Sequence, residues 1–369
     1  MVDTMVLYYR FQYKKDYDEI YQRVDRFLKE CKLESLHKND RLDYHYTSRA
    51  LSYYGFRKID FFSLKAANKY HRYFVEIELQ PIRLLQYNEH IDLSDFEQYG
   101  DIEKKFNIYI AQLFGFLNVL PTDLEFANWK VKRIDYAFQF QTPYVDTYIQ
   151  LLHRGFIPRN YQKAPYDTNF YAISKHKRYN FYSKHSHLST KKEISSEELQ
   201  RAKDVIRFEV QCEKKAIEKI EKKFCLDDTS VKNLWDKNIA QDVIYRAIQS
   251  VIGEQDFYST EVAREKLLQK DMNGSHLQLL RLIENSSNME EPKGIYCKKH
   301  GRLEHPQNKF NELLRDIREL GINPITLPSD VKLSDSLAYL PNPCRHKFFD
   351  NCAETPIGKN CYKFAKRNV

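Results

Sequence analysis

In Arg133-Ile134-Asp135-Tyr136-Ala137, polar and apolar residues alternate, and the same alternation recurs in three other short stretches of the chain. Those stretches are Glu76-Ile77-Glu78-Leu79-Gln80, Asn180-Phe181-Tyr182-Ser183-Lys184 and Arg207-Phe208-Glu209-Val210-Gln211. Successive side chains of a β-strand point to opposite faces of its sheet. The four stretches therefore predict four strands of one sheet, with an apolar face on one side and a polar face on the other.

The predicted polar face carries groups that phosphodiester chemistry uses. Lys184 follows Tyr182 by two residues, so we expect both side chains on the same face of one strand. The four strands together would gather carboxylates, a tyrosine hydroxyl and cations, namely Glu76, Glu78, Asp135, Tyr182, Lys184, Arg207 and Glu209. Such a face is costly to build for stability alone. The pattern therefore favours a metal-assisted active site that acts on DNA or RNA.

A tyrosine that nicks DNA attacks a phosphorus atom with its phenolic oxygen and displaces the 3′ oxygen. A free tyrosine titrates near pH 10, so the phenolate of Tyr182 is scarce at neutral pH and needs assistance. We expect help from the cations Lys184 and Arg207, and from a divalent metal that polarises the phosphate. Hard cations take oxygen ligands, and clustered carboxylates repel one another without a cation. The expected ligands of Mg²⁺ or Mn²⁺ are Asp135, Glu209 and Glu78.

Strand and helix patterns along the chain predict its fold class. The first half has a strand, an amphipathic helix and further strands at 1–12, 16–33, 42–64 and 73–80. After a helix at 101–118, the second half repeats this order, with a strand, a helix and strands at 129–140, 145–153, 168–174, 178–184 and 205–212. We expect an α+β fold. Its antiparallel sheet would have two related halves, with helices packed on one face and an open catalytic face.

Beyond the last of these strands the pattern changes to helical spacing, at 213–224, 231–252, 260–270, 275–285 and 306–320. Five of the twelve prolines lie after residue 323, where the sequence has no regular period. We therefore predict three parts. They are a nicking and strand-transfer domain at 1–215, a smaller helical domain with an accessory or DNA-binding role at 216–323, and an irregular tail at 324–369.

The composition favours a polyanionic partner. The chain has 369 residues, a formal net charge of +8 and 14% aromatic residues, with 27 tyrosines. Cations beside aromatic faces suit a phosphate backbone and unstacked bases. We expect DNA phosphates to contact basic residues that would otherwise be solvated surface side chains, namely Arg133, Arg154, Arg159, Lys175, Lys177 and Arg178.

Several function classes are disfavoured because their motifs are missing. The sequence has no Gly-Lys-Ser phosphate loop, no Gly-x-Gly-x-x-Gly and no Gly-x-Ser-x-Gly, so nucleotide hydrolysis, dinucleotide redox chemistry and serine hydrolysis are disfavoured. No run of about 18 apolar residues and no basic-then-apolar leader is found. We therefore expect a cytoplasmic protein without a membrane segment.

The seven cysteines fit reduced thiols in a cytosol. Cys344, Cys352 and Cys361 lie near His346 in the tail, but their spacing matches no common zinc module. We expect idle thiols there rather than zinc. The nearest paired-histidine pattern is His185-Ser186-His187, which we expect at the surface or against a phosphate rather than on a metal.

At these motifs the chain resembles rolling-circle replication initiators of the Rep_trans type, typified by the staphylococcal plasmid initiators. It also resembles the gene II/X-like phage and plasmid replication proteins. The resemblance covers about residues 70 to 215, and its motifs follow one another in the family's order. They are Ile77-Glu78-Leu79-Gln80-Pro81, Arg133-Ile134-Asp135-Tyr136-Ala137-Phe138-Gln139-Phe140, Asn180-Phe181-Tyr182-Ser183-Lys184 and Ile206-Arg207-Phe208-Glu209-Val210.

The resemblance implies that Tyr182 is the nucleophile, and that Asp135 and Glu209 bind the metal with Glu78 as a third ligand. It also implies a homodimer that recognises a double-stranded origin and enlists a host helicase. The chain departs from the family pattern at Gln139, where an acidic residue is common, and at Ser183, where Asn or Asp is usual. The helical half carries no matching motif, so it gives no residues for origin recognition.

We therefore expect a replication initiator of a plasmid or phage. It would be a metal-dependent, site-specific DNA nickase and strand transferase that forms a 5′-phosphotyrosine at Tyr182. Its substrate would be origin DNA, double-stranded or extruded as a single strand. Two alternatives stay open. One is a non-catalytic nucleic-acid-binding protein on the same sheet, and the other is a relaxase or a metal-dependent nuclease that uses water.

Overall fold

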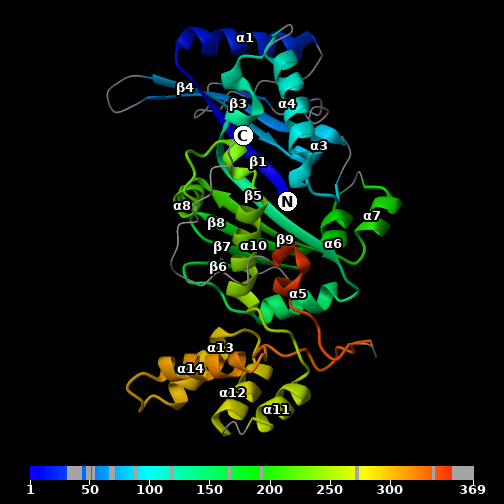
Figure 1. Cartoon of the computed structure of the whole chain (residues 1–369), viewed down its shortest axis with the longest axis vertical. Coiled ribbons are helices and arrows are strands. Elements are labelled where there is room, and N and C mark those ends of the chain that lie inside the picture. Colours follow the sequence, from blue (N-terminus) through cyan, green and yellow to red (C-terminus); the bar gives the residue numbers. More distant parts are fainter. Residues whose placement is uncertain are drawn as a thin grey trace, which may run out of the picture. The chain divides into compact units, whose positions relative to one another are not determined.

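The computed structural model of the chain describes residues 1–30, 44–46, 51, 55–65, 71–86, 90–116, 120–164, 168–191, 194–270, 274–334 and 337–350. The predicted α+β fold class is confirmed, because the described chain combines helices with an antiparallel sheet (Figure 1). The hydrogen-bonded order of the strands is β2-β3-β4-β1-β5-β9-β8-β7-β6. The predicted repeat of strand, helix and strands is present as β1, α1, β2 to β4 and then β5, α5, β6 to β9.

The strands are β1 (Val2–Phe11), β2 (Tyr44–Tyr46), β3 (Phe56–Lys65), β4 (His71–Leu79), β5 (Lys130–Gln141), β6 (Gln162–Lys163), β7 (Asn169–Ile173), β8 (Lys177–Ser183) and β9 (Val205–Glu213). The helices before β9 are α1 (Lys14–Glu30), α3 (Pro81–Leu85), α4 (Tyr99–Leu113), α5 (Val145–Arg154), α6 (Lys184–Ser189) and α7 (Ser196–Ala202). Those after it are α8 (Lys214–Phe224), α9 (Val231–Leu234), α10 (Lys237–Ile252), α11 (Thr260–Leu268), α12 (Gly274–Glu284), α13 (Glu290–Lys299) and α14 (Pro306–Glu319).

The described residues form two compact units, which are interleaved along the chain. The first unit contains 1–137 and 209–240, and the second contains 138–208 and 241–350. Strands β5 and β9 contribute residues to both units. The boundaries of these units do not coincide with residues 215 and 323, so the predicted division into three domains stays a prediction.

The core of the first unit lies between its strands and the helices α1 and α4. Helix α1 buries one stripe with a helical period, Tyr17, Ile20, Val24 and Leu28. The ring of Tyr17 lies 5.8 Å from the ring of Phe61 on β3 and 5.2 Å from that of Tyr73 on β4. Helix α4 inserts the fully buried Phe106 beside Phe56 and Trp129. These contacts fix which face of the strands is apolar.

The second unit packs α5 on β7 and β8. Its aromatic core runs across three strands, because the ring of Phe181 lies 5.7 Å from that of Phe170 and 5.1 Å from that of Phe208. The helices α11 to α14 follow in the same unit and contact one another. None of the helices in the described ranges is long and apolar enough to span a membrane.

Two local predictions were wrong, namely the place of Lys184 on a strand and the unbroken helix at 231–252. The predicted strand at 178–184 ends at Ser183, and Lys184 is the first residue of α6, because the Ser183 hydroxyl accepts a hydrogen bond from the amide of Ser186 and caps a helix there. The predicted helix at 231–252 is broken between Leu234 and Lys237 into α9 and α10. The Asp236 carboxylate accepts hydrogen bonds from the amides of Asn238 and Ile239, so it starts a new helix.

We expect Phe106→Ala to lower the free energy of unfolding by about 3–5 kcal/mol, because it leaves a cavity among three buried aromatic rings. Those rings lie at centroid distances of 5.8 Å (Phe56), 4.8 Å (Phe126) and 5.6 Å (Trp129). Ile108→Ala is the control on the same helix, because Ile108 is 43% exposed. Urea unfolding followed by circular dichroism measures both. Equal losses in the two variants would contradict this account of the core.

Candidate functional site

An extra residue in β5 brings two consecutive cations to the polar face. Val131 pairs with Leu7 and Arg133 pairs with Val6, so Lys132 is one residue more than β1 provides for. This is a β-bulge, which interrupts the alternation of side chains between the two faces. Because of the bulge, Lys132 and Arg133 both contact carboxylates of β4, although they are neighbours in sequence.

Strand β3 also contains a β-bulge. Phe56 pairs with Leu79 and Lys58 pairs with Glu78, so Arg57 is the extra residue. Arg57 Nη1 lies 3.4 Å from Glu78 Oε1, and Lys58 Nζ lies 3.9 Å from Glu78 Oε2. Two bulges therefore place four cations around the carboxylates of β4, and sequence reasoning missed three of them. The doublets Arg57-Lys58 and Lys132-Arg133 were the available signal, because each interrupts an alternating pattern.

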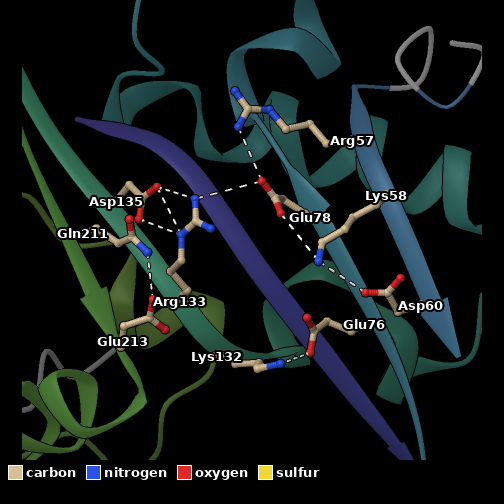
Figure 2. Close-up of polar contacts among 10 residues, drawn as sticks. All are labelled: Arg57, Lys58, Asp60, Glu76, Glu78, Lys132, Arg133, Asp135, Gln211 and Glu213. Carbon is tan, nitrogen blue, oxygen red and sulfur yellow. Dashed lines mark hydrogen bonds and ion pairs between the residues drawn. The ribbon is translucent and has the colours of Figure 1, made fainter. Parts of the chain in front are cut away.

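Together these residues form a group of ion pairs on the polar face of the first unit, in which Lys58, Glu78 and Arg133 join six side chains and the Glu76–Lys132 pair is separate, as Figure 2 shows. We call it the carboxylate cluster: Asp60, Glu76, Glu78 and Asp135 with Arg57, Lys58, Lys132 and Arg133. Lys58 Nζ lies 3.3 Å from Asp60 Oδ2, and Lys132 donates to the Glu76 carboxylate. Arg133 Nη2 lies 4.0 Å from Glu78 Oε1, across the intervening strand β1. The structure thus brings together the predicted residues Glu76, Glu78, Asp135 and Arg133.

Asp135 is the most buried acid of the cluster, with 2% of its surface exposed. Arg133 holds it in a forked geometry, with Nε 3.0 Å from Oδ1 and Nη2 2.7 Å from Oδ2. Burial raises the pKa of the Asp135 carboxyl to about 6, and the hydrogen bonds and charge of Arg133 oppose that rise. Burial is the larger effect on this pKa.

The predicted metal ligands do not fit a metal in this arrangement. The guanidinium of Arg133 lies between Asp135 and Glu78, where a shared cation was expected. Glu209 is half-buried on β9. Among the residues that the structure describes, no group of three or more His, Cys, Asp and Glu side chains could hold a metal ion. We therefore derive no chemical step through a metal, and Mg²⁺ or Mn²⁺ binding stays a prediction.

The predicted nucleophile lies in the second unit, near the end of β8. Tyr182 is 6% exposed, and its ring centroid lies 5.0 Å from that of His187 on α6. Lys184 Nζ lies 6.0 Å from the centre of the Tyr182 ring. Lys184 therefore stays close to Tyr182, although it is not on the strand. Lys184 reaches the Tyr182 ring from the first turn of α6, and not from the same face of one strand as we predicted.

Arg207 has a defined partner on β5. Its Nε and Nη2 atoms donate to Gln139 Oε1 at 2.9 Å and 2.6 Å, and only 1% of its surface is exposed. Gln139 is thus the neutral acceptor for a buried guanidinium, at the position where the resembled family commonly has an acid. Arg207 lies on β9, which neighbours β8, the strand of Tyr182. We call Tyr182, Lys184 and His187 the tyrosine cluster, because the lysine and the histidine both lie within 6.0 Å of the Tyr182 ring centre.

The residues predicted to hold DNA phosphates have different surroundings. Arg154 donates to the main-chain oxygens of Thr326, Ile283 and Glu284, so it ties α5 to later segments of the second unit. Arg159, Lys175 and Arg178 are exposed, and Lys177 is half-buried. The last three lie at the hairpin between β7 and β8, where the Ser174 hydroxyl accepts from the amides of His176 and Lys177. This hairpin is the better candidate for phosphate contact.

The cysteines within the described ranges belong to no group of three or more side chains that could hold a metal ion. Cys344 is buried and its thiol lies 3.8 Å from the Tyr245 main-chain oxygen, while His346 packs its ring against Phe138. Cys352 and Cys361 lie outside the described residues. His185 and His187 are exposed on α6, as predicted.

Comparisons with known proteins give no relative. No protein-family model, no curated protein and no solved structure matches the chain. The function of the chain is therefore inferred from its own residues.

Asp135→Asn tests the buried carboxyl through pH. The pKa of Asp135 is about 6 in the folded chain and near 3.8 when unfolded, so the folded chain binds this proton more tightly. Relative to the Asn variant, the wild type should gain about 3 kcal/mol of unfolding free energy as the pH falls from 7 to below 4. Urea unfolding of both proteins at several pH values measures this difference. A difference that does not change with pH would contradict it.

A Mn²⁺ titration tests whether the Arg133 guanidinium occupies the position at which a metal ion was expected. Because its guanidinium already neutralises Asp135, we expect the wild type and Asp135→Asn to bind the same number of Mn²⁺ ions. Electron paramagnetic resonance of the unbound Mn²⁺ measures that number. One ion fewer in the variant would show that Asp135 is a ligand and that Arg133 moves aside for a metal.

Proposed function

We propose that this chain is a DNA nickase and strand transferase that initiates rolling-circle replication of a plasmid or phage, with Tyr182 as its nucleophile. The observation that supports the proposal is the tyrosine cluster. A tyrosine lies within 6.0 Å of a lysine ammonium group, and a buried arginine occupies the neighbouring strand. A phenol that must lose its proton gains from nearby positive charge, and so does a phosphate in its transition state.

In the proposed step the Tyr182 Oη attacks a backbone phosphorus and loses its proton to solvent. A new bond forms between that oxygen and phosphorus while the bond from phosphorus to the 3′ oxygen breaks. The leaving oxygen takes up a proton and becomes a 3′ hydroxyl, and the 5′ phosphate stays on the tyrosine. Rejoining is the reverse reaction, so it needs no nucleotide. Lys184 would favour the phenolate, and Arg207 would balance charge on the phosphate.

The expected partners are those that the sequence suggested. Origin DNA is the substrate, a second copy of the chain makes the homodimer, and a host helicase unwinds the nicked duplex. The exposed cations Arg159, Lys175 and Arg178 would contact the phosphate backbone. The cytoplasm is the expected compartment. These partners and this location are part of the proposal.

A second candidate function is a nucleic-acid-binding protein that does not cut. Two observations favour it. Tyr182 is only 6% exposed, whereas a nucleophile must be reached by the DNA phosphate that it attacks. The carboxylates Asp135 and Glu78 are engaged with Arg133.

Trapping the covalent intermediate separates these candidates. The full chain is incubated with a supercoiled plasmid that carries the DNA flanking its own coding sequence, and the protein is then digested. We expect mass spectrometry to find a 5′-phosphonucleotide on the peptide that contains Tyr182, and Tyr182→Phe to abolish it. Tyr171→Phe is the matched control, because Tyr171 belongs to the adjacent strand β7 and pairs with Asn180 on β8. That variant should form the adduct like the wild type.

Other outcomes would reject the proposal. Cutting that continues in Tyr182→Phe without an adduct indicates a nuclease that uses water. Binding of the plasmid without cutting, equal in wild type and Tyr182→Phe, indicates the non-catalytic candidate. An adduct on a different tyrosine would move the nucleophile away from the tyrosine cluster.

A further inference from the structure

The polar face of the first unit changes character along β3 and β4. Starting at the carboxylate cluster, the directly paired residues are Lys58 with Glu78, Asp60 with Glu76, Phe62 with Phe74, and Leu64 with Arg72. Because paired residues two apart share a face, these pairs form one row on the side opposite the α1 contacts. Charged pairs thus give way to an aromatic pair along β3 and β4.

Three aromatic side chains form a continuous surface there. The rings of Phe62 and Phe74 are stacked, with centroids 5.3 Å apart and planes at 18°. Tyr8 on β1 lies 6.3 Å from Phe74, measured between ring centroids. All three are half-buried rather than enclosed. We call Tyr8, Phe62 and Phe74 the aromatic platform. Stability alone does not explain it, because the apolar core of the unit lies on the other face.

Cations and a cavity border the platform. Lys132 Nζ lies 5.9 Å from the centre of the Phe62 ring. Arg10 and Arg72 are exposed, and neither has an acidic partner within the described residues. A cavity of about 350 Å³ adjoins Tyr8 and is lined by Tyr8, Tyr9, Arg10, Asp123, Asn128 and Lys130. Its lining offers two tyrosine rings, two cations, an amide and a carboxylate.

We propose that the aromatic platform binds an unpaired DNA strand, with bases stacked on Phe62, Phe74 and Tyr8 and phosphates against Arg10 and Arg72. This inference rests on the proposed function and adds a surface for the strand on the first unit. Every base has an aromatic face, so stacking is independent of sequence, and cations at the edge match the phosphates. The carboxylates Asp60 and Glu76 repel phosphates, so the backbone runs along the arginine side of the platform and bases face the rings.

The chemistry argues against a protein partner. An apolar peptide would bury the rings but leave Arg10 and Arg72 without counter-charge, whereas a nucleic acid strand uses rings and cations together. A duplex is also disfavoured, because its bases are already stacked on one another. The platform therefore selects unpaired bases.

Fluorescence anisotropy with a labelled single-stranded oligonucleotide of mixed sequence tests the platform on the full chain. Phe62→Leu with Phe74→Leu keeps the surface apolar and removes both rings, and we expect at least about tenfold weaker binding. Tyr13→Leu is the control, because Tyr13 is 60% exposed and outside the platform. It should bind like the wild type. Wild-type affinity in the double variant, or equal loss in the control, would overturn the proposal.

The two arginines are tested separately through salt. Arg10→Gln with Arg72→Gln should reduce the slope of log affinity against log salt by about 1.4, because two single-strand phosphate contacts are lost. An unchanged slope would remove both arginines from the proposal. Competition with unlabelled duplex DNA and RNA of the same sequence checks the partner. Duplex should compete weakly, and a duplex or RNA that competes better than the single-stranded DNA would overturn the assignment.

Crosslinking locates the strand without a variant that could misfold. Oligonucleotides carrying 5-iodouracil are irradiated with the wild-type chain, and we expect modified peptides to contain Phe62, Phe74 or Tyr8. Crosslinks found only elsewhere would overturn the platform. This test needs no cutting of DNA, so its result is independent of the adduct experiment. An adduct on Tyr182 can be found without crosslinks at the aromatic platform, and crosslinks at the platform can be found without an adduct.

Discussion

The pairing of Asp135 with Arg133 is the constraint on which the polar face depends. A carboxylate with 2% of its surface exposed is costly to keep ionised, and a forked guanidinium is the counter-charge that suits it best. That guanidinium reaches Asp135 because both residues lie on one face of β5, two positions apart. It reaches toward Glu78 because β1 alone separates β5 from β4. Strand order, register and burial therefore combine to make one network of charge.

The strands could be predicted from the sequence because apolar residues alternate with polar ones along them, and a strand buries its apolar residues on one face of the sheet. Val75, Ile77 and Leu79 on β4 are fully buried, as the alternation requires, and the long strands β1, β4, β5 and β9 lie within a few residues of their predicted ends. The strong periodicity of α1 made it equally predictable. Short helices such as α6 were not predictable, because a single serine cap at Ser183 decides where the strand ends.

The candidate site was only partly predictable. Alternation placed Glu76, Glu78 and Asp135 on one face, and the structure brings Glu78 and Asp135 to the same guanidinium. The alternation in the sequence did not predict the Arg133 guanidinium as their partner, because the distance between Arg133 and Glu78 depends on which strands are neighbours. The partner of Arg207 could not be predicted either, because Gln139 is distant in sequence and its distance from Arg207 also depends on which strands are neighbours. The aromatic platform required the register of β3 against β4, which periodicity alone does not give.

The bulges in β3 and β5 have an evolutionary consequence. Without Lys132, Val131 would be followed by Arg133, and the inward and outward alternation would continue unbroken. The same holds for Phe56 and Lys58 without Arg57. Each bulge is therefore equivalent to the insertion of one codon, which adds a positive charge outside while the hydrophobic interior keeps its order. Descendants of such a scaffold could gain or lose cations by short insertions and deletions, and so change the charge of a surface while the fold is inherited intact.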